Sequence, residues 1–310
     1  MEMRRLGRSG LKVSEVGLGC NNFGQRLDEG QTREVVAAAL DAGVTFFDTA
    51  DVYGGEMSEV LLGKALAGRR PRAVIATKFG LQMGADELSK GASRRWIMRA
   101  VEDSLRRLGT DYIDLYQLHR PDPDTEIDET LRALDDLVTQ GKVLYVGCSK
   151  VAGWQVADAD WTARSQGGAR FVSAQNEFSI LAPEAEAELL PACERFGLGF
   201  LPYFPLANGL LSGKYRRGQP PPENARIGRT PWTKGLLTEA NFDRVEALEA
   251  WAQARGRTLL ELAFAWLLGH PAVSSVIAGA TSAAQVRANA GAAGWRLSPA
   301  EVDEVRALAA

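Results

Sequence analysis

Short apolar runs alternate with helical patterns along most of this chain, and this alternation constrains its fold more than any other feature. Most of the runs are β-branched, aromatic or continuously apolar, as in strands buried on both faces. The eight predicted strands are residues 16–19, 45–47, 73–77, 112–118, 143–146, 171–175, 199–203 and 275–277. Strand–helix alternation repeated eight times in about 270 residues predicts an α/β protein with a closed (β/α)8 TIM barrel.

Glycine and capping residues predict where the helices between these strands begin and end. Apolar stripes with helical spacing stop at Gly43, Gly109, Gly141 and Gly197. A glycine there favours the left-handed conformation that ends many helices. Capping-box patterns predict later helix starts at Thr258 with Glu261, at Ser282 with Gln285, and at Ser298 with Glu301.

Three further segments complete the predicted architecture. An open doubly wound sheet is the competing fold, but residues 17–22 lack the third glycine of its dinucleotide fingerprint. Residues 4–15 predict an N-terminal β-hairpin that plugs the floor of the barrel. Residues 216–235, rich in Pro, Arg and Gly, predict a structureless cofactor or substrate lid. No linker divides residues 1–310, which we interpret as a single barrel domain.

Composition limits the partners and the compartment. The chain has 310 residues, of which 45% are apolar, and a net charge of −3. It has no basic excess for nucleic acid or anionic membranes and no apolar run long enough to span a bilayer. Its start is charged and lacks the apolar core of a signal peptide. The three distant cysteines form no CxxC pair, so neither a disulfide framework nor a metal site is indicated, and we expect a cytoplasmic protein.

Four polar residues lie where apolar runs stop, and in a parallel barrel such positions converge at one end. Asp48, Lys78 and His119 each close a run, and Tyr53 lies in the glycine-containing turn after Asp48. A lysine ammonium about 4 Å from a phenol would lower the phenol pKa by about three units at an effective dielectric near 20. This set suits proton donation to a carbonyl oxygen while a hydride arrives from elsewhere.

A family resemblance sharpens this interpretation. Residues 46–54 (Phe-Phe-Asp-Thr-Ala-Asp-Val-Tyr-Gly), with Ser58-Glu59 and 62–66, resemble the first signature of the aldo-keto reductase superfamily. The resemblance extends over nearly the whole chain. It implies that Tyr53 is the general acid, Lys78 lowers its pKa, Asp48 pairs with Lys78, and His119 positions the carbonyl. It also implies reduction of an aldehyde or ketone by NADPH, bound without a Rossmann fold.

The same resemblance implies a set of cofactor-binding residues. Ser149 and Gln175 match residues that hold the nicotinamide carboxamide, and Tyr203 matches the aromatic residue that stacks on the ring. A loop over the pyrophosphate, a basic residue near the 2′-phosphate and a segment around the adenosine follow in the sequence. These positions are Leu206, Gly209, Leu211, Ser212, Lys214, Arg226, Gly279, Ala280, Thr281, Gln285 and Asn289.

The chain departs from the family pattern at several of these positions. Lys150 stands where an asparagine is frequent, and Phe204 stands where a serine is common. Many members carry Lys and Arg at the positions of Gly279 and Gln285. The expected preference for NADP(H) over NAD(H) therefore rests mainly on Lys214 and Arg226.

Two other classes of function stay open at this point. The chain is interpreted either as a carbonyl reductase or as a nicotinamide-binding redox-sensing or regulatory subunit with slow turnover. A barrel isomerase, lyase or metal hydrolase is the third alternative, because barrels host many chemistries. Two histidines without a ligand cluster make a metal site a poor explanation. The substrate and the oligomeric state cannot be read from the sequence.

Overall fold

A closed barrel of parallel strands forms the centre of the molecule. The computed structural model describes residues 1–223, 225–229 and 231–309. Within these residues, eight parallel strands pair in the order β10-β3-β4-β5-β6-β7-β8-β9. Their bounds are β3 Val16–Gly19, β4 Phe46–Asp48, β5 Val74–Phe79, β6 Ile113–Leu118, β7 Val143–Ser149, β8 Ser173–Gln175, β9 Gly199–Phe200 and β10 Val276–Gly279. The predicted (β/α)8 fold is confirmed.

Hydrogen bonds between β9 and the segment that leads into β10 close the barrel. The Phe200 N–H donates to the Ala272 carbonyl at 2.7 Å, and the Ser274 N–H donates to the Phe200 carbonyl at 2.9 Å. Beyond the short strand β9, the Ile277 N–H donates to the Pro202 carbonyl at 3.1 Å. The last strand in this order, β9, is therefore hydrogen-bonded to the segment of the first strand, β10, and the sheet closes into a barrel.

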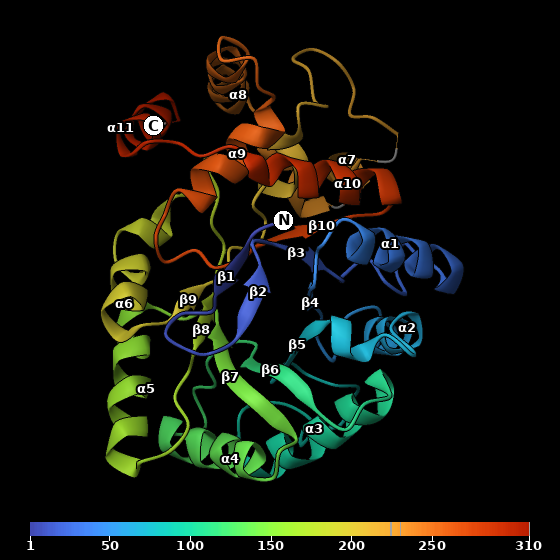
Figure 1. Ribbon diagram of the computed structural model, residues 1–310, viewed down its shortest axis with the longest axis vertical. Coiled ribbons are helices and arrows are strands. Elements are labelled where there is room, and N and C mark those ends of the chain that lie inside the picture. The colour runs from blue at the N-terminus through green and yellow to red at the C-terminus, as the bar shows by residue number, and fades with distance from the viewer. Residues whose placement is uncertain (224, 230, 310) are drawn as a thin grey trace.

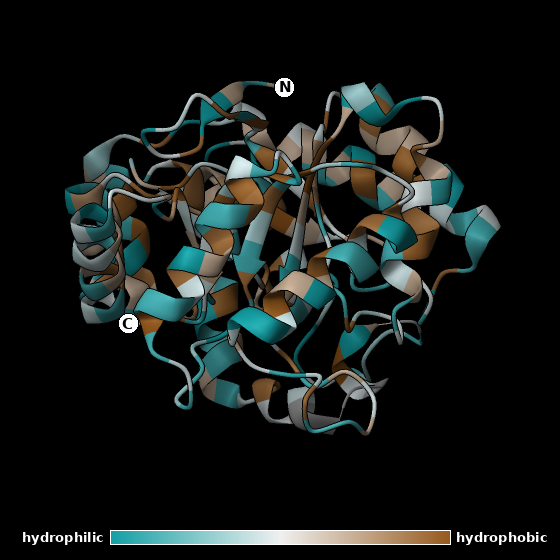
Figure 2. Cartoon of the chain, turned by 90° about the horizontal axis from the view of Figure 1, so that it is seen from below, coloured by the Kyte–Doolittle hydropathy of each residue, from teal (hydrophilic) through white to brown (hydrophobic). Residues whose placement is uncertain are grey.

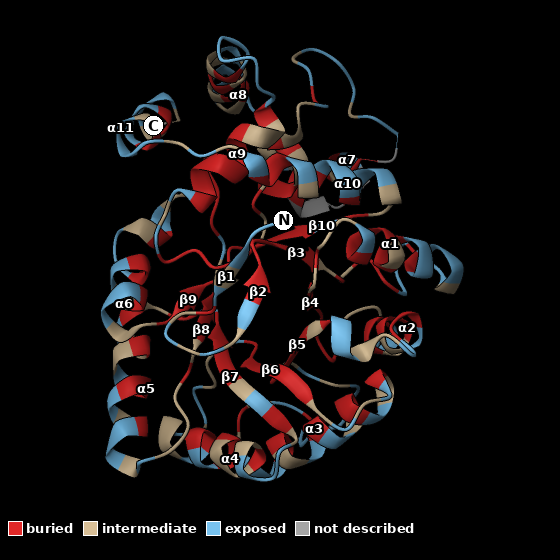
Figure 3. Ribbon diagram, in the orientation of Figure 1, coloured by how far each residue is buried: buried red, intermediate tan, exposed pale blue. Residues whose placement is uncertain are grey.

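Helices cover the outside of the barrel (Figure 1). They alternate hydrophilic and hydrophobic residues, as amphipathic helices do (Figure 2), while the strands are mostly buried (Figure 3). Their bounds are α1 Glu29–Asp41, α2 Met57–Ala65, α3 Arg94–Leu108, α4 Ile127–Thr139, α5 Gly153–Gln166, α6 Leu189–Phe196, α9 Leu259–Leu268 and α10 Ala283–Gly291. Two further helices, α8 Glu239–Gln253 and α11 Pro299–Leu308, lie at the periphery. Among the described residues, no helix has both the length and the apolar character needed to cross a membrane.

The predicted helix ends follow from local chemistry. Gly43, Gly109, Gly141 and Gly197 all have φ between 63° and 79°, a conformation that costs glycine little. Both hydrogen bonds of the capping box are present at Thr258 and at Ser298.

The N-terminal hairpin, β1 Met3–Arg5 and β2 Lys12–Ser14, closes the floor of the barrel. Leu6 and Val13 are fully buried against Phe46, Leu115 and other side chains from the lower barrel interior. The turn also packs closely: a Cβ on Gly7 would lie 2.4 Å from the Gly197 carbonyl oxygen. The hairpin therefore blocks the end of the barrel opposite the carboxyl ends of the strands.

The long connection between β9 and α8 is not structureless, contrary to the sequence prediction for residues 216–235. It contains the short helical segments η3 Ala207–Ser212, α7 Arg226–Arg229 and η4 Pro231–Leu236. The first two are interrupted by non-helical backbone at 208–209 and at 227–228. Arg216 forms an ion pair with Glu249, and Arg217 forms ion pairs with Asp243 and Glu246, all on α8. These contacts attach the start of the segment to α8. Its Pro and Gly residues obscured the short helical turns, which carry no periodic apolar pattern.

Candidate functional site

The four predicted catalytic residues meet at the carboxyl ends of β4, β5 and β6. Asp48 is the last residue of β4, Lys78 lies near the end of β5, and His119 follows β6. Side chains alternate between the two faces of a strand, so Asp48 and Lys78 point into the barrel, while Phe47 and Thr77 face the helices. Tyr53 reaches the same place from the turn between β4 and α2.

Lys78 is completely buried and is held by three oxygens. Its Nζ donates to Asp48 Oδ2 at 2.7 Å, to the Thr49 carbonyl at 2.9 Å, and more weakly to Tyr53 Oη at 3.5 Å. Burial alone would lower the pKa of Lys78, but the charge of Asp48 and the phenol of Tyr53 outweigh burial and raise it. The lysine therefore stays charged, as a buried cation with a well-placed partner does.

The pKa of Tyr53 moves in the direction opposite to the sequence prediction. Burial of the phenol raises its pKa above the ordinary value, and the opposing effect of Lys78 is smaller. The prediction of a lowered pKa was wrong because the cost of desolvating a phenolate exceeds the effect of the lysine charge. A raised pKa keeps Tyr53 protonated at neutral pH, as a proton donor must be.

His119 is a neutral, buried imidazole beside Tyr53. The two rings meet edge to face with centroids 5.7 Å apart. Burial, together with the charges of Lys78, Lys150 and Arg120, lowers the pKa of His119 to about 2. Its Nδ1 is buried without a hydrogen-bond partner among the described residues. A neutral imidazole has one N–H, which is available as a donor to a substrate oxygen.

A pocket of about 610 Å³ opens above these residues, a volume typical of cofactor sites. Asp48, Tyr53 and His119 line it. Lys78 lies behind them and reaches the pocket through Tyr53. Among the predicted cofactor residues, those that line the pocket are Ser149, Gln175, Tyr203, Leu206, Gly209, Ser212, Lys214, Arg226, Gly279, Ala280, Thr281, Gln285 and Asn289. Leu211 differs, because its side chain is fully buried in the apolar core.

The polar groups predicted for the nicotinamide carboxamide already have protein partners. Ser149 Oγ donates to the Gln175 carbonyl at 2.7 Å, and Gln175 Nε2 donates to Asp48 Oδ1 at 2.8 Å. Gln117 Nε2 donates to the same carboxylate oxygen at 3.3 Å. Asp48 therefore accepts hydrogen bonds from two amides in addition to its bond with Lys78, and Gln175 lines the pocket beside it.

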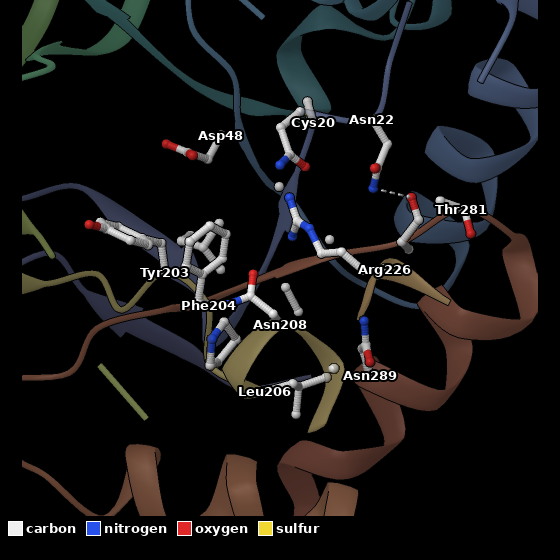
Figure 4. Close-up of a pocket in the computed structure, with 18 of the residues that line it drawn as sticks. Cys20, Asn22, Asp48, Tyr203, Phe204, Leu206, Asn208, Arg226, Thr281 and Asn289 are labelled. Carbon is white, nitrogen blue, oxygen red and sulfur yellow. Dashed lines mark hydrogen bonds between the residues drawn. The ribbon is translucent and has the colours of Figure 1, made fainter. Parts of the chain in front are cut away.

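Cations gather at the other end of the pocket, where Figure 4 shows Arg226, Thr281 and Asn289. Burial lowers the pKa of Lys214 and of Arg226, and the charge of Arg26 lowers both further. In the described part of the chain, no carboxylate forms an ion pair with Lys214 or Arg226. Like charges held together in this way fit the phosphates of a dinucleotide.

Nearby polar contacts shape the end of the pocket that the sequence predicts to hold the adenosine. Ser282 caps α10, but Gln285 does not complete the capping box. Its Oε1 accepts from the Thr281 N–H at 2.7 Å instead. Asn22 Nδ2 donates to the Ala280 carbonyl at 3.3 Å, as the dashed line in Figure 4 marks. These bonds fix the 279–281 segment beside the helix start.

Arg26 and Asn208 line the pocket although the sequence did not single them out. Arg26 lies in the loop between β3 and α1. Asn208 is buried with φ of 58° inside η3. An asparagine before a glycine was the available signal for Asn208, since asparagine tolerates the left-handed region. Arg26 gave no local signal, because only the folded loop brings it to the cations of the distant 214–226 segment.

A second acidic group lies behind the Tyr53 turn. Asp51 is buried, and neither of its carboxylate oxygens has a hydrogen-bond partner among the described residues. Burial and the neighbouring charge of Glu59 raise the pKa of Asp51 to about 8. Glu59 is also buried, but it accepts from Thr77 Oγ1 at 2.5 Å and from Arg107 Nε at 2.7 Å.

A parallel barrel with a phenol, a lysine–carboxylate pair and an imidazole at its strand ends defines the class of protein. Comparison with known families agrees with the geometry: residues 15–310 match the model of the Aldo/keto reductase family. The chain belongs to this family of oxidoreductases, and the predicted family membership is confirmed.

Named relatives cover most of the chain and differ in the roles that their names indicate. A "Probable voltage-gated potassium channel subunit beta" from Oryza sativa subsp. japonica is 35% identical over 99% of this chain and 96% of its own length. A "Versiconal hemiacetal acetate reductase" from Aspergillus parasiticus is 35% identical over 89% of this chain and 88% of its own. A "Probable aldo-keto reductase 1" from Glycine max is 34% identical, with coverages of 97% and 87%.

Proposed function

We propose that this protein reduces aldehyde or ketone carbonyls with NADPH and that Tyr53 is the general acid. The observation that carries the proposal is the contact of the pocket-lining Tyr53 phenol with Lys78, whose Nζ lies 2.7 Å from Asp48 Oδ2. NADPH, when bound, supplies the hydride.

Each of the four residues has a distinct part in the proposed reaction. Tyr53 donates its phenolic proton to the carbonyl oxygen as negative charge develops there, and Lys78 stabilises the phenolate that remains. Asp48 keeps Lys78 charged and in place. His119, neutral at physiological pH, donates a hydrogen bond that orients the carbonyl oxygen. Proton donation by a positioned acid contributes roughly 10²–10⁴-fold to such a rate.

The residues present fit the cofactor. Lys214 and Arg226 would hold phosphate groups, including the 2′-phosphate that distinguishes NADPH from NADH. Tyr203 would pack on the nicotinamide, next to Ser149 and Gln175. Thr281, Gln285 and Asn289 would surround the adenosine at the start of α10, where the helix dipole favours negative charge. The segment 216–235 would act as a lid, since it carries Arg226 to the pocket. Three buried free thiols, Cys20, Cys148 and Cys193, are compatible with a cytoplasmic location.

The direct test is loss of NADPH absorbance with a panel of aldehydes and ketones, for wild type and Tyr53→Phe. We expect turnover by wild type and a loss of at least about 10²-fold in kcat for the variant. NADPH binding, followed by fluorescence, serves as the control and should be retained. Full activity in Tyr53→Phe, or no turnover of any carbonyl by wild type, would contradict the proposal.

A nicotinamide-binding regulatory subunit with slow turnover is the second candidate, and the relatives named as potassium channel β subunits favour it. On this alternative NADPH would bind tightly, turnover would be very slow across the panel, and a stable partner would be recovered by pull-down. The complete arrangement around Tyr53 favours the reductase.

A further inference from the structure

Two cations have no part in the proposed reaction: Lys150, which lines the pocket, and Arg120, which lies at the neighbouring strand end. Lys150 directly follows β7, and Arg120 directly follows His119 at the end of β6. These strands are neighbours, with Leu118 paired to Cys148, so the two cations lie at adjacent strand ends. Lys150 lines the same pocket as His119, while Arg120 is exposed.

The protein supplies no counter-ion for Lys150. Within the described residues, its Nζ makes no hydrogen bond or ion pair. Burial lowers the pKa of Lys150, and the charges that act on it, those of Lys78 and Arg120, lower it further. Arg120 has an acid nearby, because its charge helps to lower the pKa of Asp122. Asp122, however, already accepts hydrogen bonds from the Ala92 N–H and from Thr125 Oγ1. The rim around Lys150 therefore has an excess of positive charge.

The backbone holds Lys150 in a conformation that lysine rarely adopts. Its φ is 57°, in the left-handed region. The Lys150 N–H donates to the Gln175 carbonyl at 3.0 Å, and Asn176 bonds to both the N–H and the carbonyl of Val151. Backbone conformations of this kind persist where the surroundings impose them, and they cluster at ligand sites.

The cofactor's phosphates have their own cations elsewhere in the pocket. The charges that act on Lys214 are those of Arg26 and Arg226, whereas those that act on Lys150 are Lys78 and Arg120. Lys214 and Arg226 come from the connection between β9 and α8, whereas Lys150 follows β7, so cations reach the pocket from two different parts of the fold. The group at Lys150 lies near Tyr53 and His119, at the end where the carbonyl would react.

We propose that Lys150, assisted by Arg120, binds an anionic group of the substrate, so that carbonyl compounds with a carboxylate or a phosphate are preferred over neutral ones. The inference rests on the proposed carbonyl reduction and names its substrate class. Lys150 is then a specificity-determining residue and takes no part in proton transfer.

The test compares charged and neutral substrates of matched shape. Wild type, Lys150→Asn and Lys150→Arg are assayed with 4-carboxybenzaldehyde, its methyl ester, and 4-formylphenyl phosphate. Asparagine tolerates a positive φ, so Lys150→Asn removes the charge without adding backbone strain. We expect the ratio of kcat/KM for the acid over the ester to fall about tenfold in Lys150→Asn, mainly through KM, and to be largely retained in Lys150→Arg. The phosphate arm shows which of the two anions is preferred.

An unchanged acid-to-ester ratio in Lys150→Asn would overturn the inference and leave the reductase proposal standing. Calorimetric binding of terephthalate provides a readout that needs no turnover. Wild type should bind this dianion about tenfold more tightly than Lys150→Asn. Equal binding by the two proteins would overturn the anion site even if no carbonyl were reduced.

Discussion

The two ends of the pocket differ in whether a carboxylate of the protein balances their buried cations. At the catalytic end, Lys78 is fully buried, and Asp48, with hydrogen bonds from Gln117 and Gln175, balances it. At the proposed adenosine end, Lys214 and Arg226 are partly buried without a carboxylate partner in the described chain, and burial and the charges of Arg26 and Arg226 lower the pKa of Lys214. The Lys78–Asp48 pair is balanced within the protein itself, while no carboxylate of the described chain balances the second group.

The largest expected effect comes from removing one charge of the buried Lys78–Asp48 ion pair. Lys78→Met leaves the Asp48 carboxylate buried without its counter-ion, so we expect a loss of about 3–5 kcal/mol in the free energy of unfolding. Activity should be lost as well, because Lys78 contacts Tyr53. Denaturant titration and the NADPH assay measure the two effects.

The double variant Asp48→Asn with Lys78→Met is the matched control. It removes both charges, so it should recover much of the stability but none of the activity. Equal stabilities of the single and double variants would contradict the explanation that the unpaired Asp48 carboxylate causes the loss of stability in Lys78→Met.

At the adenosine end the opposite outcome is expected, with ligand affinity lost and stability kept. Arg226→Gln or Lys214→Gln should weaken NADPH binding by roughly tenfold or more, because each removes a charge-assisted hydrogen bond worth about 1.5–3 kcal/mol. NADH binding should change less, which fluorescence titration of both nucleotides can measure. Arg217→Gln is the control, since Arg217 pairs with α8 and does not line the pocket. Equal losses for both nucleotides would contradict a role at the 2′-phosphate.

A pH-dependent effect tests Asp51, a buried acid behind the Tyr53 turn whose carboxylate oxygens have no hydrogen-bond partner among the described residues. The folded-state pKa of Asp51 is raised to about 8, above its value in the unfolded chain near 4. Its contribution to stability is therefore present below about pH 4 and is lost as the pH rises to about 8. Asp51→Asn should raise the free energy of unfolding, by an amount that grows by up to ~1.4 kcal/mol per pH unit within this window. Denaturant titrations at about pH 5 and about pH 8 check this growth, and a pH-independent difference would contradict it.

The smallest expected effect is the absence of a histidine titration. With a pKa lowered to about 2, His119 is neutral throughout the range in which enzymes are usually assayed. The pH profile of kcat/KM should therefore keep its shape between about pH 5 and about pH 8 in His119→Gln, even though the rate falls. An inflection near pH 6.5 in wild type that disappears in the variant would contradict the neutral imidazole.

The sequence predicted the barrel and the meeting of Asp48, Lys78 and His119 because both follow from one rule. In a parallel barrel, a polar residue at the end of an apolar run lies at the shared carboxyl edge. The proposed cofactor residues rest only on the family resemblance, which covers positions without a local pattern, and of these Leu211 does not line the pocket.

Other features could not be predicted, because they depend on burial and on distant segments. The direction of the Tyr53 pKa shift is decided by desolvation, which spacing does not reveal. Gln175 bonds to Asp48 across 127 positions of sequence. The short helices within 216–235 arise where proline and glycine dominate, so apolar periodicity gave no signal for them.

The hairpin that fills the floor of the barrel affects the order in which ligands can enter and leave the pocket. Leu6 and Val13 block passage beneath the catalytic residues, so ligands and water exchange through the mouth above them. In a pocket with one opening, a molecule bound deep beside Lys78 can dissociate only after a second molecule bound above it has left. If the proposed reduction takes place here, the rate of a complete cycle would depend on how quickly the upper ligand leaves, as well as on the chemical step below.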